Sequence, residues 1–143
     1  MNEKHAAICK VEFLPVKGVK VESPIGATSA KLVSFSSCIR IPSSSAELQE
    51  NRKSPGEPVD VQFVATLTDT SPGSLELLRN VTYLYGLLIL QYTDGSFRLL
   101  GTPDSPILVT YEKNGTPAVY ELQVSTQQPE FSKTLADENL PAF

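Results

Sequence analysis

Few side chains in this sequence are of the types that catalyse reactions near neutral pH. Histidine occurs once, as His5, in a segment that we predict to be an N-terminal tail. A Ser-His-Asp or Cys-His catalytic system would have to recruit this residue, and a tail holds catalytic geometry poorly. We therefore predict a protein that is not an enzyme and assign no catalytic residue. The alternative is an enzyme with two carboxylates paired in space, although the sequence singles out no such pair.

The metal-ligating residue types are equally sparse. Two cysteines, Cys9 and Cys38, and one histidine give three scattered donors, too few for a zinc site. No acidic loop has the calcium-binding pattern, and Asp94-Gly95 is interpreted as a turn. Gly73 is the glycine nearest to the start of a predicted helix and it stands alone, so no phosphate-binding loop is expected. We predict no metal and no cofactor.

The two cysteines are expected to remain free thiols. Strand alternation puts Cys9 on an apolar face and Cys38 on a polar face. Pairing would require close Cβ atoms that face one another.

The charge balance argues against a nucleic-acid partner. The chain has 12 basic and 16 acidic residues and a formal net charge of −4, whereas nucleic-acid binders usually have a basic surplus. The one basic cluster, Arg52-Lys53, lies among Glu47, Glu50 and Glu57, which is typical of a solvated loop.

No membrane partner is expected either. The longest apolar run is 87–90, far below the roughly 20 residues that a membrane helix needs. Polar residues follow Met1 without the apolar stretch of a secretory signal, so no signal peptide is predicted. The glycosylation patterns at Asn80 and Asn114 are then chance matches.

The chain length and the frequent prolines and glycines indicate one domain built from short elements. The chain has 143 residues, with 11 prolines and 8 glycines. Side chains alternate between apolar and polar along most of it, which predicts β-strands. We predict a mainly β fold: an antiparallel β-sandwich or barrel of about eight strands with one short helix. The expected strands cover 6–14, 19–22, 31–41, 59–68, 89–92, 97–100, 107–111 and 117–124.

Three further segments complete the expected domain. Leu75, Leu78 and Val81 recur at helical spacing, so we predict a helix over 72–80 with Ser71 as its cap. Apolar periodicity vanishes over 42–58, which predicts a long loop, either a mobile surface loop or an arm that orders against a neighbouring subunit. The expected β domain spans 1–125, and 126–143 is expected to be a loosely ordered tail.

Two turn dipeptides allow hairpin registers to be predicted. A two-residue turn at Asp94-Gly95 pairs Tyr92 with Phe97 and Leu90 with Leu99.

The same arithmetic applies at Asn114-Gly115, where it pairs Tyr111 with Ala118, Val109 with Tyr120 and Ile107 with Leu122. Pro117 lacks an N–H, so the start of 117–124 is expected at a sheet edge or bulge.

The tyrosines are the basis of an alternative functional hypothesis. Five occur, and on strands such residues are usually half-buried packing residues. A β-sandwich module that binds carbohydrate or peptide would instead present them along a concave groove. They are Tyr83, Tyr85, Tyr92, Tyr111 and Tyr120.

The last 60 or so residues resemble structural proteins of phages and prophages of Bacteroides-type bacteria. The segments concerned are Phe97-Arg98-Leu99-Leu100-Gly101-Thr102, Pro106-Ile107-Leu108-Val109 and Tyr120-Glu121-Leu122-Gln123-Val124. The layout is also similar to the phage tail-tube fold, although the predicted helix is short for that fold. The resemblance implies subunits that form stacked rings, with 42–58 and 126–143 contacting neighbours.

We therefore expect a non-catalytic structural subunit of a phage or prophage tail. It would act by self-assembly into a homo-oligomeric ring, with other virion proteins as partners. Its location would be the bacterial cytoplasm before assembly and the virion afterwards.

Overall fold

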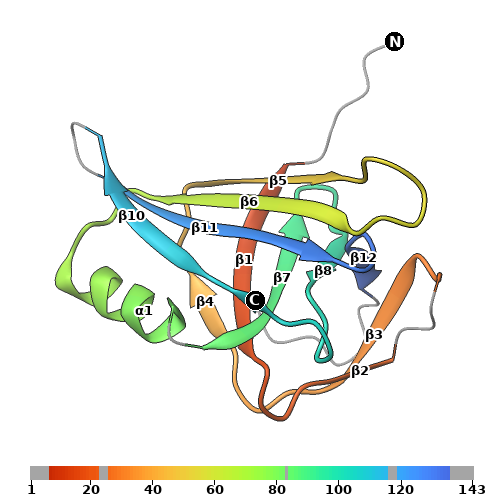
Figure 1. Cartoon of the computed structure of the whole chain (residues 1–143). Helices are drawn as coiled ribbons and strands as arrows, with labels where there is room; N and C mark the ends of the chain where they lie inside the picture. Colours follow the sequence, from red (N-terminus) through yellow and green to blue (C-terminus); the bar gives the residue numbers. More distant parts are fainter. Residues whose placement is uncertain (1–6, 23–25, 83, 116–118, 136–143) are drawn as a thin grey trace.

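The computed structural model describes residues 7–22, 26–82, 84–115 and 119–135. Within these ranges the chain forms twelve strands and one helix, arranged as two sheets that face one another (Figure 1). The predicted mainly β, sandwich-like fold with one short helix is confirmed, with more strands than the roughly eight expected. Neither sheet closes into a barrel over the described ranges.

The smaller sheet has four strands in the order β10-β11-β6-β5. They are β5 (Ser45–Asn51), β6 (Val59–Leu67), β10 (Thr110–Asn114) and β11 (Val119–Gln128). All three neighbouring pairs are antiparallel. The alternation predicted for 59–68 is confirmed in β6, where every second residue from Val59 to Leu67 is buried.

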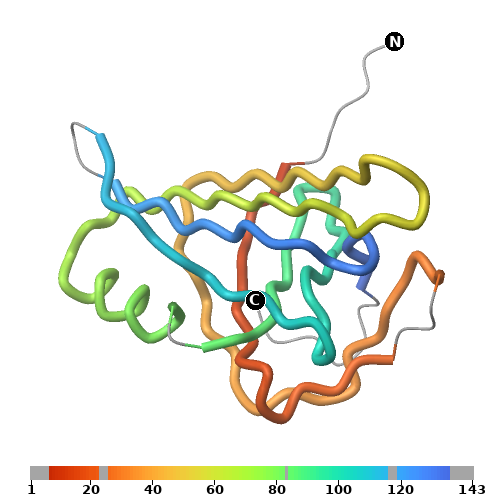
Figure 2. The backbone as a smooth tube through the Cα atoms, in the orientation of Figure 1, coloured from red at the N-terminus to blue at the C-terminus, as the bar shows by residue number. Residues whose placement is uncertain are grey.

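The larger sheet has eight strands. Seven follow the order β2-β3-β12-β8-β7-β1-β4, and β9 pairs with β7 off this path. The strands are β1 (Ile8–Pro15), β2 (Lys20–Glu22), β3 (Ser29–Ser34), β4 (Ile39–Ile41), β7 (Tyr85–Tyr92), β8 (Phe97–Leu100), β9 (Ile107–Leu108) and β12 (Lys133–Leu135). The backbone trace shows the β2-β3 hairpin lying away from the smaller sheet (Figure 2).

The core has two parts, one on each face of the larger sheet. Leu88 and Leu90 of β7 pack between the two sheets, beside Phe13 and Phe63. Leu87 and Ile89 point the other way and pack with Leu14, Leu32 and Leu135. The apolar run 87–90 is therefore a strand buried on both faces, which is why it does not alternate.

The helix α1 (Pro72–Thr82) extends two residues beyond the predicted 72–80. Pro72 occupies its first turn, and the Ser71 carbonyl accepts the first helical hydrogen bond from the Leu75 N–H. The Asp69 carboxylate accepts the Ser71 N–H at 2.9 Å. Leu78 and Val81 are buried against the core between the sheets.

The predicted register of the first hairpin is wrong by one residue. Phe97 pairs with Gln91, and Leu99 pairs with Ile89. The loop contains three residues because Gly95 adopts a φ of +88° and follows the turn as a bulge. The Asp94 carboxylate fixes this loop by accepting the Ser96 N–H at 2.9 Å.

The second predicted register is also wrong. Tyr111 pairs with Leu122 rather than Ala118, and Lys113 pairs with Tyr120. The shift of four residues is even, so each side chain keeps its face. Ile107 lies in β9 and pairs with Gly86 of the larger sheet instead of Leu122. Pro117 lies outside the described residues.

Two segments predicted to lack structure contain strands. The proposed loop 42–58 includes β5, an edge strand with only two apolar residues, Ala46 and Leu48. Edge strands need little apolar surface, so periodicity does not reveal them. The proposed tail 126–143 includes the end of β11 and all of β12, which lies between β3 and β8. Residues 136–143 lie outside the described part.

The expected strands near the N-terminus are partly corrected. The segment 31–41 contains two strands, β3 and β4, rather than one. In β1 the register shifts between Ile8 and Lys10, so Cys9 is the extra residue of a bulge. Cys9 is consequently exposed, contrary to the apolar face predicted for it.

Candidate functional site

The smaller sheet ends in two open edges, β5 and β10, over the described residues. On the solvent face, β5 presents Ser45, Glu47 and Gln49, and β10 presents Thr110 and Glu112, all exposed. Half of the backbone N–H and C=O groups of an edge strand point away from its one neighbour. Both strands therefore have backbone groups that no strand pairs within the described residues, and α1 contacts β10.

A groove of about 700 Å³ follows the β5 edge. It lies where the two sheets separate, between Ala46 and Leu48 of β5 and Ile8 and Tyr92 of the larger sheet. All four side chains are partly buried and pack against the core between the sheets. An added strand at this edge would therefore cover apolar as well as backbone groups.

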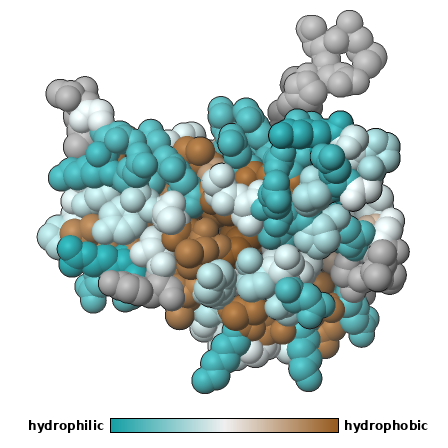
Figure 3. Space-filling view, viewed as in Figure 1, coloured by the Kyte–Doolittle hydropathy of each residue, from teal (hydrophilic) through white to brown (hydrophobic). Residues whose placement is uncertain are grey.

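An exposed apolar patch lies at the start of β7. Its members Leu84, Tyr85 and Leu108 are 41%, 57% and 40% exposed. Tyr85 and Leu108 are direct partners in the β7–β9 pair. Seen from the side of Figure 1, the hydropathy surface shows apolar residues gathered near the middle of the molecule (Figure 3).

A polar cluster fastens the connection between the two sheets. The chain crosses from β11 to β12 through residues 129–132. Ser132, the last residue of this crossover, is at the centre of the polar cluster. The Glu50 carboxylate accepts both the N–H and the hydroxyl of Ser132 at 2.6 Å. Arg98 donates from Nη1 to the carbonyl and hydroxyl oxygens of Ser132, at 3.2 and 3.3 Å. The cluster thus joins β5, β8 and the crossover segment.

Arg52 contacts the same crossover. Its Nη2 donates to the Pro129 carbonyl at 3.1 Å, and its guanidinium lies 5.3 Å from the centre of the Phe131 ring. Its Nε is buried and has no acceptor among the described residues.

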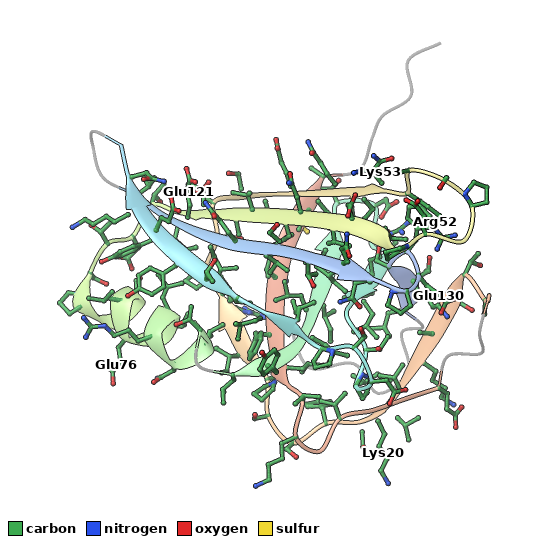
Figure 4. All side chains as sticks on the ribbon, in the orientation of Figure 1. Lys20, Arg52, Lys53, Glu76, Glu121 and Glu130 are labelled. Atoms are coloured by element: carbon green, nitrogen blue, oxygen red, sulfur yellow. The ribbon has the colours of Figure 1, made fainter. Side chains whose placement is uncertain are left out.

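Glu130 and Lys133 form an ion pair beside Arg52. The Lys133 ammonium lies 3.0 Å from the Glu130 carboxylate, which also accepts the Gly26 N–H at 2.8 Å. The Gly26 hydrogen bond, and then Lys133, hold the pKa of Glu130 below its usual value. The side-chain view shows Arg52 and Glu130 at the same end of the molecule, near β12 (Figure 4).

A buried carboxylate lies on β1, the strand beside the edge strand β4 of the larger sheet. Glu12 is only 2% exposed. It accepts a hydrogen bond from the Cys38 thiol and pairs with Arg40 at 3.2 Å. Burial, followed by the hydrogen bond and negative charge of Glu12, raises the pKa of Cys38 to about 12. The thiol is therefore protonated, and so unreactive, at neutral pH.

The residues weighed from the sequence are dispersed. His5 and Tyr83 lie outside the described residues. Tyr111 and Tyr120 pack edge to face with ring centres 6.0 Å apart. Tyr92 lines the β5 groove, and Tyr85 belongs to the exposed patch.

Arg52, interpreted from the sequence as part of a solvated loop, instead contacts the crossover. Sequence reasoning also missed Glu50, Arg98 and Ser132. In the sequence, Ser132 is 82 residues from Glu50 and 34 residues from Arg98. These side chains meet only after folding, so no local sequence pattern marks them.

Over the described ranges, no three side chains of the His, Cys, Asp and Glu types come together as a metal site. Within the same ranges, no helix has the length and apolar character required to cross a bilayer. Comparison with protein-family models, curated proteins and solved structures finds no match to this chain.

Proposed function

We propose that this protein is a non-catalytic structural subunit that assembles with copies of itself through the open edges of its smaller sheet. The observation that carries the proposal is the relative direction of the two edge strands. The sheet has four antiparallel strands, so its terminal strands β5 and β10 run in opposite directions. A second copy related by rotation about an axis along the strands would present its β10 antiparallel to β5 of the first. Repetition of this contact closes a ring or builds a tube.

The side chains of the two edges are compatible in one register. Antiparallel pairing of Tyr111 with Ala46 of the next copy joins apolar residues on the core-facing side of both strands. The same register puts Thr110 opposite Glu47 and Glu112 opposite Ser45. It therefore avoids placing two carboxylates directly opposite one another.

The narrower proposal is a subunit of a phage or prophage tail. It follows from the sequence resemblance and is compatible with an assembly of rings. Other virion proteins would then be partners, and the virion would be the final location. Capsid, tape-measure or baseplate genes beside the coding sequence would support this narrower proposal.

The test is a charge swap at the proposed interface, measured by size-exclusion chromatography with light scattering. Wild-type protein should give an oligomer of ring size. Thr110→Glu places a carboxylate opposite Glu47 and should yield monomers, and the double variant Thr110→Glu with Glu47→Lys should restore the oligomer. Gln62→Glu is the matched control because Gln62 is exposed on the central strand β6. A wild-type chain that stays monomeric at its highest soluble concentration contradicts the proposal.

A second candidate function is a peptide-binding module, favoured by the groove of about 700 Å³ beside β5. A partner peptide would add to β5 as a strand and place alternate side chains over Leu48 and Tyr92. In that case the chain is monomeric and Thr110→Glu leaves it unchanged. Leu48→Lys should then abolish capture of extended apolar peptides from a peptide array.

A further inference from the structure

A second groove, separate from both sheet edges, has a local excess of positive charge. It occupies about 400 Å³ beside the crossover segment. Its lining includes three basic side chains, Arg52, Arg98 and Lys133, and one acidic side chain, Glu130. The Glu50 carboxylate, which is bonded to the lining residue Ser132, adds a second negative charge nearby and still leaves a positive balance. The chain as a whole has a net charge of −4, so this groove is opposite in sign to the rest of the molecule.

The two arginines retain unused donors. A guanidinium has five N–H groups arranged in a planar fork. Arg52 donates from Nη2 to the Pro129 carbonyl, and Arg98 donates from Nη1 to Ser132. The buried Nε of Arg52 has no acceptor among the described residues, and the other N–H groups of its guanidinium are on the two Nη atoms.

The side chains are also held in place. Arg52 stacks on Phe131, Arg98 is anchored to Ser132, and Lys133 is 6% exposed and paired with Glu130. Their positions are therefore fixed before any ligand arrives, which reduces the entropy lost on binding.

We propose that this groove binds a small phosphate-type dianion, held by the guanidinium groups of Arg52 and Arg98 with Lys133 adding charge. Arginine forks match the oxygens of phosphate, and a dianion uses more of the available donors than a carboxylate does. The groove's volume of about 400 Å³ leaves room for the group that bears the phosphate. This proposal does not depend on the proposed assembly, because no residue of β5 or β10 lines the groove.

The test is titration of the full chain with inorganic phosphate at constant ionic strength, followed by heteronuclear NMR. Saturable shifts should appear at the groove residues 26–28, 98 and 130–134, and acetate should bind more weakly. Arg52→Ala should weaken phosphate binding about tenfold, the loss expected for one charge-assisted contact. Lys53→Ala removes the same charge from the next residue, which is exposed and outside the groove. It should change the affinity less than about twofold.

Two more variants distinguish a loss of phosphate binding from a loss of folding. Arg52→Lys keeps the charge but not the planar fork, and it should fold normally and bind phosphate several-fold more weakly. Glu130→Gln keeps an acceptor for Gly26 and removes the competing charge, so it should bind more tightly. Absence of saturable shifts, or equal losses for Arg52→Ala and Lys53→Ala, would overturn the proposal. A change in oligomeric state does not enter this readout.

Discussion

The two sheets of this protein differ in how their central strands are covered. In the larger sheet, β7 is buried on both faces, with Leu88 between the sheets and Leu87 in the second core. In the smaller sheet, β6 is buried on one face, while Gln62 and Val64 on the other face are exposed. The larger sheet thus contributes most of the buried apolar surface. The smaller sheet leaves one face and two edges available for other contacts.

This difference assigns stability and recognition to separate parts of the molecule. Hydrophobic burial is the dominant favourable term in folding, and β7 contributes to it from both sides. A strand covered on one side can change its outer face without loss of the core. Substitutions should therefore have opposite consequences in the two sheets: loss of folding in one, and change of assembly with folding retained in the other.

The largest effect is expected from truncations on the two faces of β7. Leu88→Ala and Leu87→Ala should each lower the free energy of unfolding by about 3 kcal/mol, because each removes a fully buried side chain from a different core. Val64→Ala on the exposed face of β6 is the control, with an expected loss below about 0.5 kcal/mol. Urea denaturation measures all three. A neutral Leu87→Ala would mean that the second core contributes nothing and that the contrast between the sheets is wrong.

The sequence identified the elements whose alternation is strong and missed those whose stability comes from their neighbours. The alternation of β6 and the spacing of α1 predict both elements, because one face of each is apolar. The strand β5 has only Ala46 and Leu48, and its structure depends on seven residues of pairing with β6. The strand β12 has three residues, and its position between β3 and β8 is a property of the whole sheet.

The hairpin registers show a different limit. The Asp94-Gly95 dipeptide lies in its turn, whereas Asn114 is the last residue of β10 and pairs with Val119. The dipeptides do not give the loop length, which fixes the register. A single φ of +88° at Gly95 changes every pair of the first hairpin. The candidate sites were even harder to predict from the sequence. Glu50 and Ser132 are adjacent only because β5 and the crossover meet at one end of the sandwich.

The next effect compares a central with an edge strand. Gln62 and Gln49 are direct partners on β6 and β5, so they share a residue type and a face of the sheet. Gln62→Pro should cost about 3 kcal/mol, because the N–H of a central strand lies in a ladder on either side. Gln49→Pro should cost clearly less, since β5 has one neighbour. Thermal unfolding followed by circular dichroism measures both.

A proline within the proposed contact has a second readout. If β5 receives the β10 strand of another copy, Glu47→Pro, at the position that the proposed register places opposite Thr110, should reduce the oligomer while the monomer stays folded. Equal destabilisation by Gln49→Pro and Gln62→Pro would show that β5 is as enclosed as β6, and the edge would then be no site for another strand.

The smallest effect concerns the one carboxylate buried in the doubly covered strand β1. Burial, and then the hydrogen bond and negative charge of Glu12, raise the pKa of the Cys38 thiol from 9.0 to about 12. A folded-state pKa above the unfolded value favours the protonated form. This contribution to stability is therefore complete below about pH 9 and is lost as the pH rises toward 12. Cys9, exposed on its bulge, should react with iodoacetamide at pH 8 long before Cys38 does.

Glu12→Gln in a Cys9→Ser background tests the cause of this difference. The substitution removes the negative charge and keeps a hydrogen-bonding group, so the pKa of Cys38 should fall and its alkylation should become several-fold faster. Glu22→Gln, which alters an exposed carboxylate on β2, should leave the rate unchanged. If Cys38 is alkylated as fast as Cys9 in the otherwise native chain, then the outer face of β1 is open to solvent. The larger sheet would then be covered on one face at this position, as the smaller sheet is.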